Sequence, residues 1–393
     1  MPEPPTSTPP RRVFISVAEV SGDENAAAFI RSLHELDPAI IVEGLGGPRM
    51  REAGAVIHHE TVGGAAMLLH GLSRAGEIWR LLRWTRRHFQ THKPDLQVCV
   101  DSSGMNFHFA KVAREAGVPV LYYVAPQLWA SRPGRIKQLR RWINRVASII
   151  PFEEEYFRQR GVEATFVGHP LFDRLPAERP SLSRPPAVQE LAHRPPVVGL
   201  LPGSRRTEVR ANFPHMLQVA RLILAQIPQA KFLVPATAST HSIAVQIAAQ
   251  ANVPNLRIES DAIDAMLPTC DLCIAKSGTT TLHAAAYGIP MIVVYRLNPL
   301  VWHLAGRFIV KTKSIALVNL LAGPRIEDRI VPEIVPWWGS DLPVAQMALE
   351  MLREPHHLDA QRQNLLRIVR PLDHPGASRN AARMALDLMM ARD

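Results

Sequence analysis

The stretch VVGLLPGSRRTEV, residues 197–209, combines an apolar strand, a glycine turn and the first turn of a helix. An uninterrupted apolar run of this kind is typical of a strand that is buried on both faces of a parallel sheet. A second strand, turn and helix follow at residues 272–287, where Lys276 comes directly after the strand and the turn continues Ser-Gly-Thr. Both segments predict βα units of a doubly wound α/β domain.

The same alternation extends over most of the 393 residues. Strands are predicted at residues 13–17, 40–45, 96–100, 120–124, 147–150, 164–167, 197–201, 232–234, 256–258, 272–275 and 291–294. Six prolines between residues 176 and 196 oppose regular structure and predict a linker. We therefore expect a disordered tail at 1–12, an α/β domain at 13–175, a linker at 176–196, a second α/β domain at 197–343, and C-terminal helices at 344–393 that can pack back on the first domain.

Composition excludes several classes of protein. With 47 % hydrophobic and 20 % charged residues the chain is globular. No apolar run reaches the roughly 18 residues of a membrane-spanning helix, and the N-terminus lacks the apolar core of a signal peptide. Three cysteines exclude a disulfide framework and favour the cytosol. Cys270 and Cys273 lack a second pair, and His58, His59 and His70 lack ligand spacing, so no metal site is predicted.

The net charge of +10 is carried by two segments, residues 72–93 and residues 131–145. Such concentration favours a local anionic surface or ligand over nucleic acid, for which the chain lacks aromatic stacking motifs. Residues 72–89 combine Trp, Leu and Arg at helical spacing. This pattern suits a helix on an anionic membrane, or a sheet-covering helix with solvated arginines. The apolar piece 65–69 is a further candidate for membrane contact.

Acidic residues mark the expected active-site edge of the first domain. Asp101 directly follows the strand at 96–100. Because ligands bind at the carboxyl ends of parallel strands, Asp101 is a candidate general base, with an N-cap as the alternative. Glu19 and Asp23 in the first βα turn have the same two interpretations, and Asp23 is favoured as a cap. His169 is either a ligand contact or a loop histidine with internal partners.

Two turns in the second domain are candidate anion sites. Gly203 and Ser204 permit a tight turn with outward N–H groups, and Arg205 adds a forked donor for a pyrophosphate. Ser277 and Thr279 open the other helix with hydroxyl donors. Ordinary turns and N-caps are the alternatives. Both turns are predicted at the same edge of one sheet.

Taken together, these motifs resemble the lipid-A-disaccharide synthases, inverting glycosyltransferases of the GT-B fold. The resemblance covers residues 13 to 332 or so. Its motifs are AEVSGD (18–23), LGGPRM (45–50), KPD…VDSSGMN (93–106), YYVAPQLWASRPGRI (122–136), PFEEEYF (151–157), FVGHPLFD (166–173), LLPGSRRTEV (200–209), KSGTTTLHAAAYGIPMIVVYR (276–296) and VNLLAGPRIEDRIVPE (318–333).

The resemblance implies two Rossmann-like doubly wound domains that face a cleft, with the acceptor side in 13–175 and the UDP-sugar side in 197–343. It implies transfer of 2,3-diacylglucosamine from its UDP donor to 2,3-diacylglucosamine 1-phosphate through a β(1→6) bond, with no metal or other cofactor. Asp101 is then the essential acidic residue and the base, and Glu19, Ser21 and Trp129 belong to the acceptor side. The donor residues are Gly203, Ser204, Arg205, Ser277, Gly278, Thr279, His283 and Asn319.

The expected partners are the two substrates and an anionic membrane, and nucleic acid is excluded. The enzyme is expected at the cytoplasmic face of the inner membrane, and whether it forms a homodimer is left open. His283 stands where the family usually has a Glu suited to the ribose. Two alternatives therefore remain. One is another UDP-sugar enzyme of this fold, such as a 2-epimerase or a different acyl-sugar transferase. The other is a UDP-binding homologue without catalysis.

Overall fold

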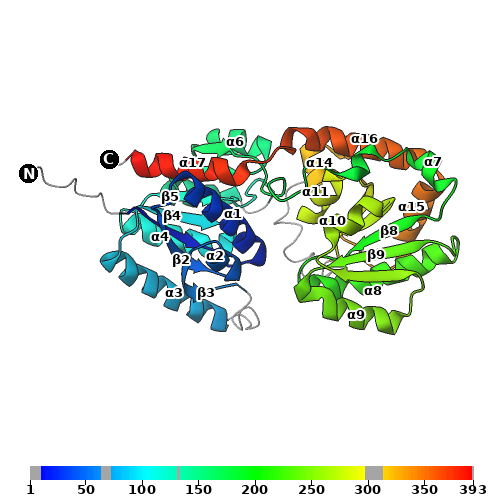
Figure 1. Cartoon of the computed structure of the whole chain (residues 1–393), viewed down its shortest axis with the longest axis horizontal. Coiled ribbons are helices and arrows are strands. Elements are labelled where there is room, and N and C mark those ends of the chain that lie inside the picture. Colours follow the sequence, from blue (N-terminus) through cyan, green and yellow to red (C-terminus); the bar gives the residue numbers. More distant parts are fainter. Residues whose placement is uncertain (1–9, 63–71, 131–132, 297–312, 392–393) are drawn as a thin grey trace, which may run out of the picture. The chain divides into compact units, whose positions relative to one another are not determined.

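The computed structural model describes residues 10–62, 72–130, 133–296 and 313–391. These form two compact units, which Figure 1 shows in the colours of the sequence. Unit 1 combines the described residues of Met1–Arg174 and His374–Asp393, and unit 2 is Leu175–Asp373. The apolar piece 65–69, His70 and residues 131–132 of the second basic segment lie outside the described residues. Within the described part, no helix is both long and apolar enough to cross a membrane.

Unit 1 is built on seven parallel strands in the order β3-β2-β1-β4-β5-β6-β7. The central strands are apolar runs that are buried along their length, as expected of a sheet covered on both faces. The strands are β1 (Arg12–Ser16), β2 (Ile41–Gly46), β3 (Val56–Glu60), β4 (Leu96–Val100), β5 (Val120–Tyr123), β6 (Arg145–Ser148) and β7 (Ala164–Phe166).

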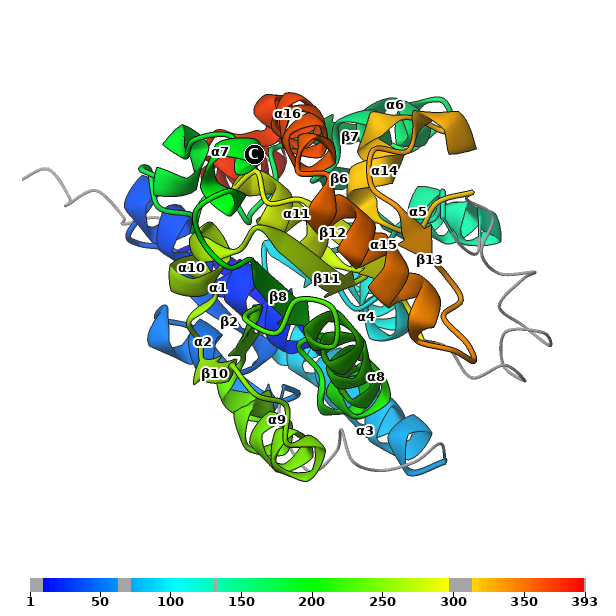
Figure 2. The same cartoon turned by 90° about the vertical axis from the view of Figure 1, so that its right-hand side faces the viewer.

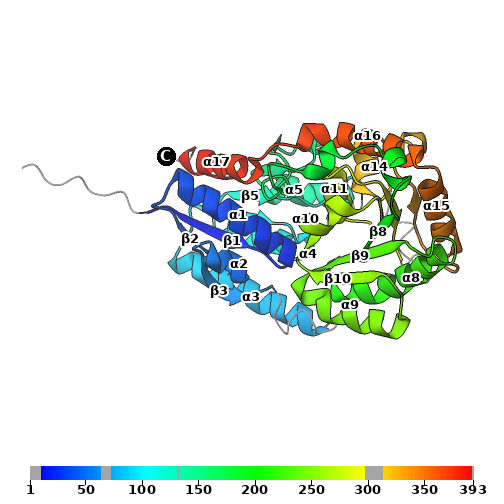
Figure 3. The ribbon, with the colours of Figure 1, turned by 45° about the vertical axis from the view of Figure 1, so that its right-hand side comes forward.

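Helices cover both faces of this sheet. Helices α3, α4 and α5 pack in sequence on one face, while α1 packs against α2 and α17 on the other (Figure 3). The helices of unit 1 are α1 (Val20–Leu36), α2 (Pro48–Glu52), α3 (Leu72–Thr91), α4 (Ser103–Glu115), α5 (Ile136–Trp142), α6 (Pro151–Arg158) and α17 (Ala377–Met390), with the short 3₁₀ helix η2 (Pro133–Arg135).

The last helix, α17, belongs to the first unit although it ends the chain. Its buried residues are mostly alanines, among them Ala381, Ala382 and Ala385, and the helix packs against α1. Asp173 fixes its first turn, because its carboxylate accepts backbone hydrogen bonds of 2.6, 3.0 and 2.8 Å from three residues at the start of the helix. An anion at a helix N-terminus satisfies N–H groups that otherwise lack partners.

Unit 2 is built on six parallel strands in the order β10-β9-β8-β11-β12-β13. The strands are β8 (Val197–Leu201), β9 (Lys231–Ala236), β10 (Leu256–Ser260), β11 (Leu272–Lys276), β12 (Met291–Val294) and β13 (Glu333–Ile334). β8 and β11 are neighbours at the centre of the sheet, so the two turns that follow them start side by side.

Helices α8, α9 and α15 pack together over one face of the second sheet, and α11, α14 and α16 pack together over the other (Figure 2). The helices of unit 2 are α7 (Ala187–Leu191), α8 (Arg206–Leu224), α9 (Ala238–Ala251), α10 (Ile263–Met266), α11 (Thr279–Ala286), α14 (Leu317–Ala322), α15 (Leu342–Arg353) and α16 (His356–Val369), with 3₁₀ helices η3 (Pro180–Ser183), η4 (Leu267–Thr269), η6 (Ile326–Asp328) and η7 (Arg370–Leu372).

The proline-rich segment 176–196 differs from the expectation that prolines prevent regular structure there. It contains η3 and α7. Proline is well tolerated at the start of a helix, because the first N–H groups of a helix have no partner within it and the absence of one costs little. The segment is also fixed to the body of unit 2. Arg184 and Arg194 reach the buried Asp271 with nitrogen–oxygen distances of 2.8 and 2.6 Å.

Candidate functional site

Asp101 directly follows β4, and its backbone is strained. Asp101 has φ 54° and Ser102 has φ 46°, so both occupy the left-handed region. A residue other than glycine there costs roughly 1–2 kcal/mol. The Asp101 carbonyl accepts hydrogen bonds from Tyr122 Oη at 2.7 Å and Asn106 Nδ2 at 2.9 Å. Two side chains therefore hold a conformation that the free chain would avoid.

The Asp101 carboxylate is positioned by its neighbours. Its Oδ1 accepts a hydrogen bond of 2.7 Å from the Ser102 backbone N–H, and its Oδ2 accepts one of 3.3 Å from Ser21 Oγ. Gly22 makes the close approach of α1 possible, since a Cβ there would lie 2.9 Å from Val17 Cγ1 and 3.5 Å from Asp101 Cβ. A side chain at residue 22 would push α1 away from the carboxylate.

A cavity of about 370 Å³ lies in front of this carboxylate, within unit 1. Glu19 lines it from the start of α1, and the exposed Ser21 lies beside it through its bond to Asp101. The wall of the cavity is partly apolar. Its lining residues are Ala18, Glu19, Thr61, Glu77, Ile78, Leu81, Asp101, Ser102, Ser103, Gly104 and Met105.

Trp129 does not line this cavity. Its indole Nε1 donates a 2.9 Å hydrogen bond to Glu153 Oε1, and its ring meets Phe152 edge-on at 5.0 Å. Glu153 is fully buried at the start of α6. Burial raises the pKa of Glu153 to about 7, although hydrogen bonds from Trp129 and the backbone N–H groups of Ile150 and Ile149 act in the opposite direction.

Asp23 and His169 have structural roles. The buried Asp23 carboxylate accepts hydrogen bonds of 3.0, 3.2 and 3.0 Å from the backbone N–H groups of Gly47, Met50 and Arg49, so it caps α2. This agrees with the interpretation of Asp23 as a cap, although the helix that it caps is α2 and not α1, the helix in which it lies. His169 accepts a 3.2 Å hydrogen bond from the Leu171 N–H, and burial lowers its pKa to about 3.

In unit 2 the turn after β8 depends on glycine. Gly203 has φ 117°, and a Cβ there would lie 2.4 Å from Glu208 Oε2. Ser204 and Arg205 follow at the exposed start of α8. Glu208 lies one turn into that helix, with its Oε1 3.5 Å from Arg205 Nη1.

The turn after β11 meets the first turn through an ion pair. Lys276 Nζ lies 3.0 Å from Glu208 Oε1, and both side chains are largely buried. Ser277 is buried and donates a hydrogen bond of 3.1 Å to the Ile315 carbonyl. Gly278, with φ 154°, precedes the exposed Thr279 at the first position of α11. The two predicted anion turns therefore form one polar surface at the carboxyl end of the sheet.

His283 and Asn319 are both committed to internal partners. His283 Nε2 lies 2.7 Å from Asp264 Oδ1, which also accepts a 2.8 Å hydrogen bond from Tyr287 Oη. The imidazole stacks on the Tyr287 ring at 5.8 Å. Asn319 is buried. Its Nδ2 donates to Glu333 Oε1 at 2.7 Å, and its Oδ1 accepts from the Ile330 and Val331 N–H groups at 2.9 and 3.0 Å.

Several polar residues at these places were not singled out from the sequence. Glu208 and Lys276 are 68 positions apart, and Asp264 and His283 are 19 apart, so only the fold reveals the pairs. A third group, Glu43, His58 and His88, lies in unit 1, where one ligand-type atom from each residue lies within 4.8 Å of the others. Linear spacing predicted no such site, because His58 and His88 are 30 residues apart.

Relatives of known family match nearly the whole chain. A sequence profile described as lipid-A-disaccharide synthetase matches residues 13–381. The lipid-A-disaccharide synthase of Geobacter metallireducens is 33 % identical over 386 residues, covering 98 % of both chains. The lipid-A-disaccharide synthase of Trichlorobacter lovleyi is 35 % identical over 385 residues, covering 97 % of this chain and 98 % of the relative.

Solved structures agree on the fold. The glycotransferase of kitacinnamycin has a TM-score of 0.60 at 14 % identity, covering 97 % of this chain and 99 % of that one. The UDP-GlcNAc 2-epimerase from Neisseria meningitidis bound to UDP-GlcNAc has a TM-score of 0.55 at 10 % identity, covering 97 % and 100 %. Identities this low show the fold alone, which is of the GT-B type and confirms the predicted α/β class. Together, the profile and the two full-length relatives show that the chain belongs to the lipid-A-disaccharide synthase family and is a glycosyltransferase of lipid A biosynthesis.

Proposed function

We propose that Asp101 is the general base of the glycosyl transfer. The observation that supports it is a carboxylate in a strained, doubly anchored backbone at the edge of a cavity. As the 6-hydroxyl of 2,3-diacylglucosamine 1-phosphate attacks the anomeric carbon, its proton passes to Asp101. The new C–O bond forms on the face opposite the leaving group, and UDP departs with the electrons of the broken bond. The anomeric configuration is thereby inverted.

The donor pyrophosphate is assigned to the two turns of unit 2. Backbone N–H groups of Gly203 and Ser204, at the start of the 19-residue α8, favour an anion. Arg205 adds a forked donor, and the turn from Ser277 to Thr279 adds hydroxyls. These groups stabilise the charge that develops on UDP as it leaves. Lys276 contributes a positive charge at the end of β11, and its ion pair with Glu208 holds it in place.

The remaining predicted residues receive supporting roles. His283 with Asp264 is assigned to the ribose, because the pair presents a carboxylate close to the position where the family usually has Glu. Asn319 acts as a positioning residue, since its amide holds the segment 330–333. On the acceptor side, Glu19 and Ser21 contact the sugar near Asp101. Trp129 orders the loop after β5 through its bond to Glu153.

The experiment is a product assay with the UDP-diacylglucosamine donor and the labelled acceptor. Asp101→Asn is expected to lower the transfer rate by about 10²–10⁴-fold while UDP affinity stays the same. Glu77→Gln removes another carboxylate from the same cavity and is the matched control, expected to retain most activity. Full activity in Asp101→Asn overturns the assignment. UDP binding without disaccharide in the wild type supports the non-catalytic alternative, and an epimerised donor supports the epimerase.

We propose further that the enzyme lies on the cytoplasmic face of the inner membrane through α3. Trp79 on this helix is 61 % exposed, and the Arg83 guanidinium lies 5.1 Å from its ring centre. An exposed aromatic ring among arginines suits the interface of an anionic leaflet. Trp79→Ala is expected to reduce sedimentation with phosphatidylglycerol vesicles several-fold. Arg86→Ala, which removes an arginine paired with Glu115, is the control with a smaller effect. Light scattering of the protein without vesicles measures its molecular mass and so tests whether it forms a homodimer.

A further inference from the structure

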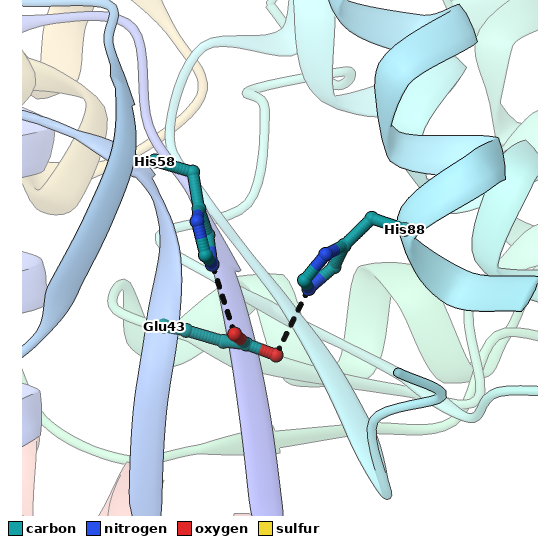
Figure 4. A group of neighbouring side chains, drawn as sticks. All are labelled: Glu43, His58 and His88. Carbon is teal, nitrogen blue, oxygen red and sulfur yellow. Dashed lines mark hydrogen bonds and ion pairs between the residues drawn. The ribbon is translucent and has the colours of Figure 1, made fainter. Parts of the chain in front are cut away.

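Three side chains converge in unit 1 outside the cavity that Asp101 lines. Glu43 projects from β2, His58 from β3 and His88 from α3, as Figure 4 shows. His58 Nε2 lies 2.9 Å from Glu43 Oε2, and His88 Nε2 lies 3.1 Å from Glu43 Oε1. Both imidazoles thus turn the same ring nitrogen toward the two oxygens of one carboxylate.

The group is enclosed but has one open side. The Glu43 side chain is 5 % exposed, His88 is 11 % exposed and His58 is 25 % exposed. A carboxylate so far removed from water needs strong compensating partners. His58 is the most exposed of the three side chains.

The donor set and its geometry fit a zinc ion. The three donor atoms lie within 4.8 Å of one another. Zinc binds imidazole nitrogen and carboxylate oxygen at about 2.0–2.2 Å, and tetrahedral geometry places such donors roughly 3.3 Å apart. The observed nitrogen–oxygen distances of 2.9 and 3.1 Å require little expansion to reach this spacing. We propose that Glu43, His58 and His88 bind one Zn²⁺, with water as the fourth ligand.

Neighbouring rings hold the two imidazoles in position. Trp84 stacks on His88 with ring centres 4.8 Å apart and planes at 12°, and its ring lies 5.0 Å from that of His58. Such outer contacts fix ligand orientation in metal sites. Arg12 Nη1 lies 3.9 Å from Glu43 Oε1, beyond hydrogen-bond distance. Its charge weakens cation binding, but it does not take the place of either imidazole.

The proposed ion has a structural role. His88 is seven residues beyond Leu81 on α3, which corresponds to about 10 Å along the helix axis. Leu81, Ile78 and Glu77 in the first half of α3 line the Asp101 cavity. Zinc at His88 would tie α3 to β2 and β3, and so would steady one wall of that cavity from a distance. It would not touch the reacting groups.

The test measures metal binding by the full chain. Protein freed of metal with EDTA receives one equivalent of Zn²⁺, is desalted, and is analysed by elemental mass spectrometry. Co²⁺ replaces Zn²⁺ in a parallel sample, because tetrahedral cobalt has intense visible absorption. We expect one zinc ion per chain and a raised Tm. Glu43→Gln should weaken zinc binding by more than about tenfold, because losing a ligand costs at least as much affinity as losing a residue that only hydrogen-bonds a ligand.

Two further variants make the outcome decisive. His58→Gln changes the most exposed of the three ligands, so it tests the site even if Glu43→Gln fails to fold. The double variant His356→Ala/His357→Ala removes an exposed acidic and histidine group elsewhere and is expected to bind zinc as the wild type does. Substoichiometric zinc in the wild type, undiminished binding in the Glu43 and His58 variants, or loss of zinc in the double variant overturns the proposal.

Discussion

The turn after β4 in unit 1 and the turns after β8 and β11 in unit 2 reach a positive φ by opposite means. After β4 the residues with positive φ are Asp101 and Ser102, while after β8 and β11 they are Gly203 and Gly278. Glycine adopts this conformation without a steric penalty, whereas aspartate and serine do not. Strain is thus accepted where a carboxylate must stand at the turn. It is avoided where the backbone N–H groups are the proposed ligands.

The two places also differ in charge. Three acidic side chains, Glu19, Glu77 and Asp101, line the cavity of unit 1. The turns of unit 2 carry Arg205 and Lys276, both paired with Glu208. The first arrangement suits the removal of a proton from a hydroxyl, and the second suits phosphate groups. The difference follows from chemistry and not from topology, since both sheets are parallel and doubly wound.

Removing strain and carboxylate together gives the largest expected effect. Asp101→Gly should lower the transfer rate by about 10²–10⁴-fold. The free energy of unfolding should change by less than about 1 kcal/mol, because relief of the left-handed strain is offset by the entropy cost of glycine. Transfer kinetics and denaturant unfolding measure the two quantities. Ser102→Gly relieves neighbouring strain without removing the base, so an equal loss of rate in that variant would contradict the distinction.

The second-largest expected effect concerns Glu153, the buried acid at the start of α6. The pKa of Glu153 is about 7 in the folded protein, against 4.5 as its ordinary value. The folded state therefore binds the proton more tightly, and stability falls as pH rises from 4.5 to 7, by roughly 3 kcal/mol. Glu153→Gln cannot ionise, so its Tm should fall less between pH 5 and pH 8. Parallel pH profiles for the two proteins would be the opposite result.

Gly203→Ala introduces into the turn after β8 a backbone strain like that of Asp101 after β4. The new Cβ would lie 2.4 Å from Glu208 Oε2 at a φ of 117°. We expect a loss of about 1–3 kcal/mol in stability and at least about tenfold weaker UDP binding. Calorimetric titration and thermal unfolding measure both. Gly104→Ala is the control, because a Cβ there meets nothing within 4 Å and Gly104 is not among the residues with positive φ.

The smallest expected effect is at Ser21. Its hydroxyl donates a long hydrogen bond of 3.3 Å to Asp101 Oδ2 from an exposed position. Ser21→Ala should lower kcat by only a few-fold, consistent with about 1 kcal/mol for such a bond, and should shift the pH profile of kcat toward higher pH. Loss of activity comparable to Asp101→Gly would mean that Ser21 acts directly on the substrate.

The sequence predicted the strands that are buried and apolar. The segments 96–100 and 197–201 coincide with β4 and β8, and Asp101 follows its strand as expected. Two strands escaped prediction. β3, with the sequence VIHHE, is a partly exposed edge strand, and β13 is only two residues long. Neither has the apolar run from which the other strands were recognised.

The site was predictable as a set of positions but not as a set of contacts. The positive φ of Asp101 depends on bonds from Asn106 and Tyr122, which no local pattern encodes. The pair of Glu208 and Lys276 is likewise created by adjacent strands that are distant in sequence. Periodicity describes one element at a time, whereas these contacts require knowledge of which strands are neighbours.

The placement of α17 has a consequence for the order of biosynthesis. Unit 2 is one uninterrupted stretch, Leu175–Asp373, whereas unit 1 needs both ends of the chain. The whole of unit 2 is therefore synthesised before the helix that completes unit 1. Until then the apolar surface of α1 that α17 will cover is exposed. The Asp173 carboxylate also lacks the backbone N–H groups of that helix as hydrogen-bond donors. A chain that ends at residue 373 would contain all of unit 2 but would lack the helix that completes unit 1.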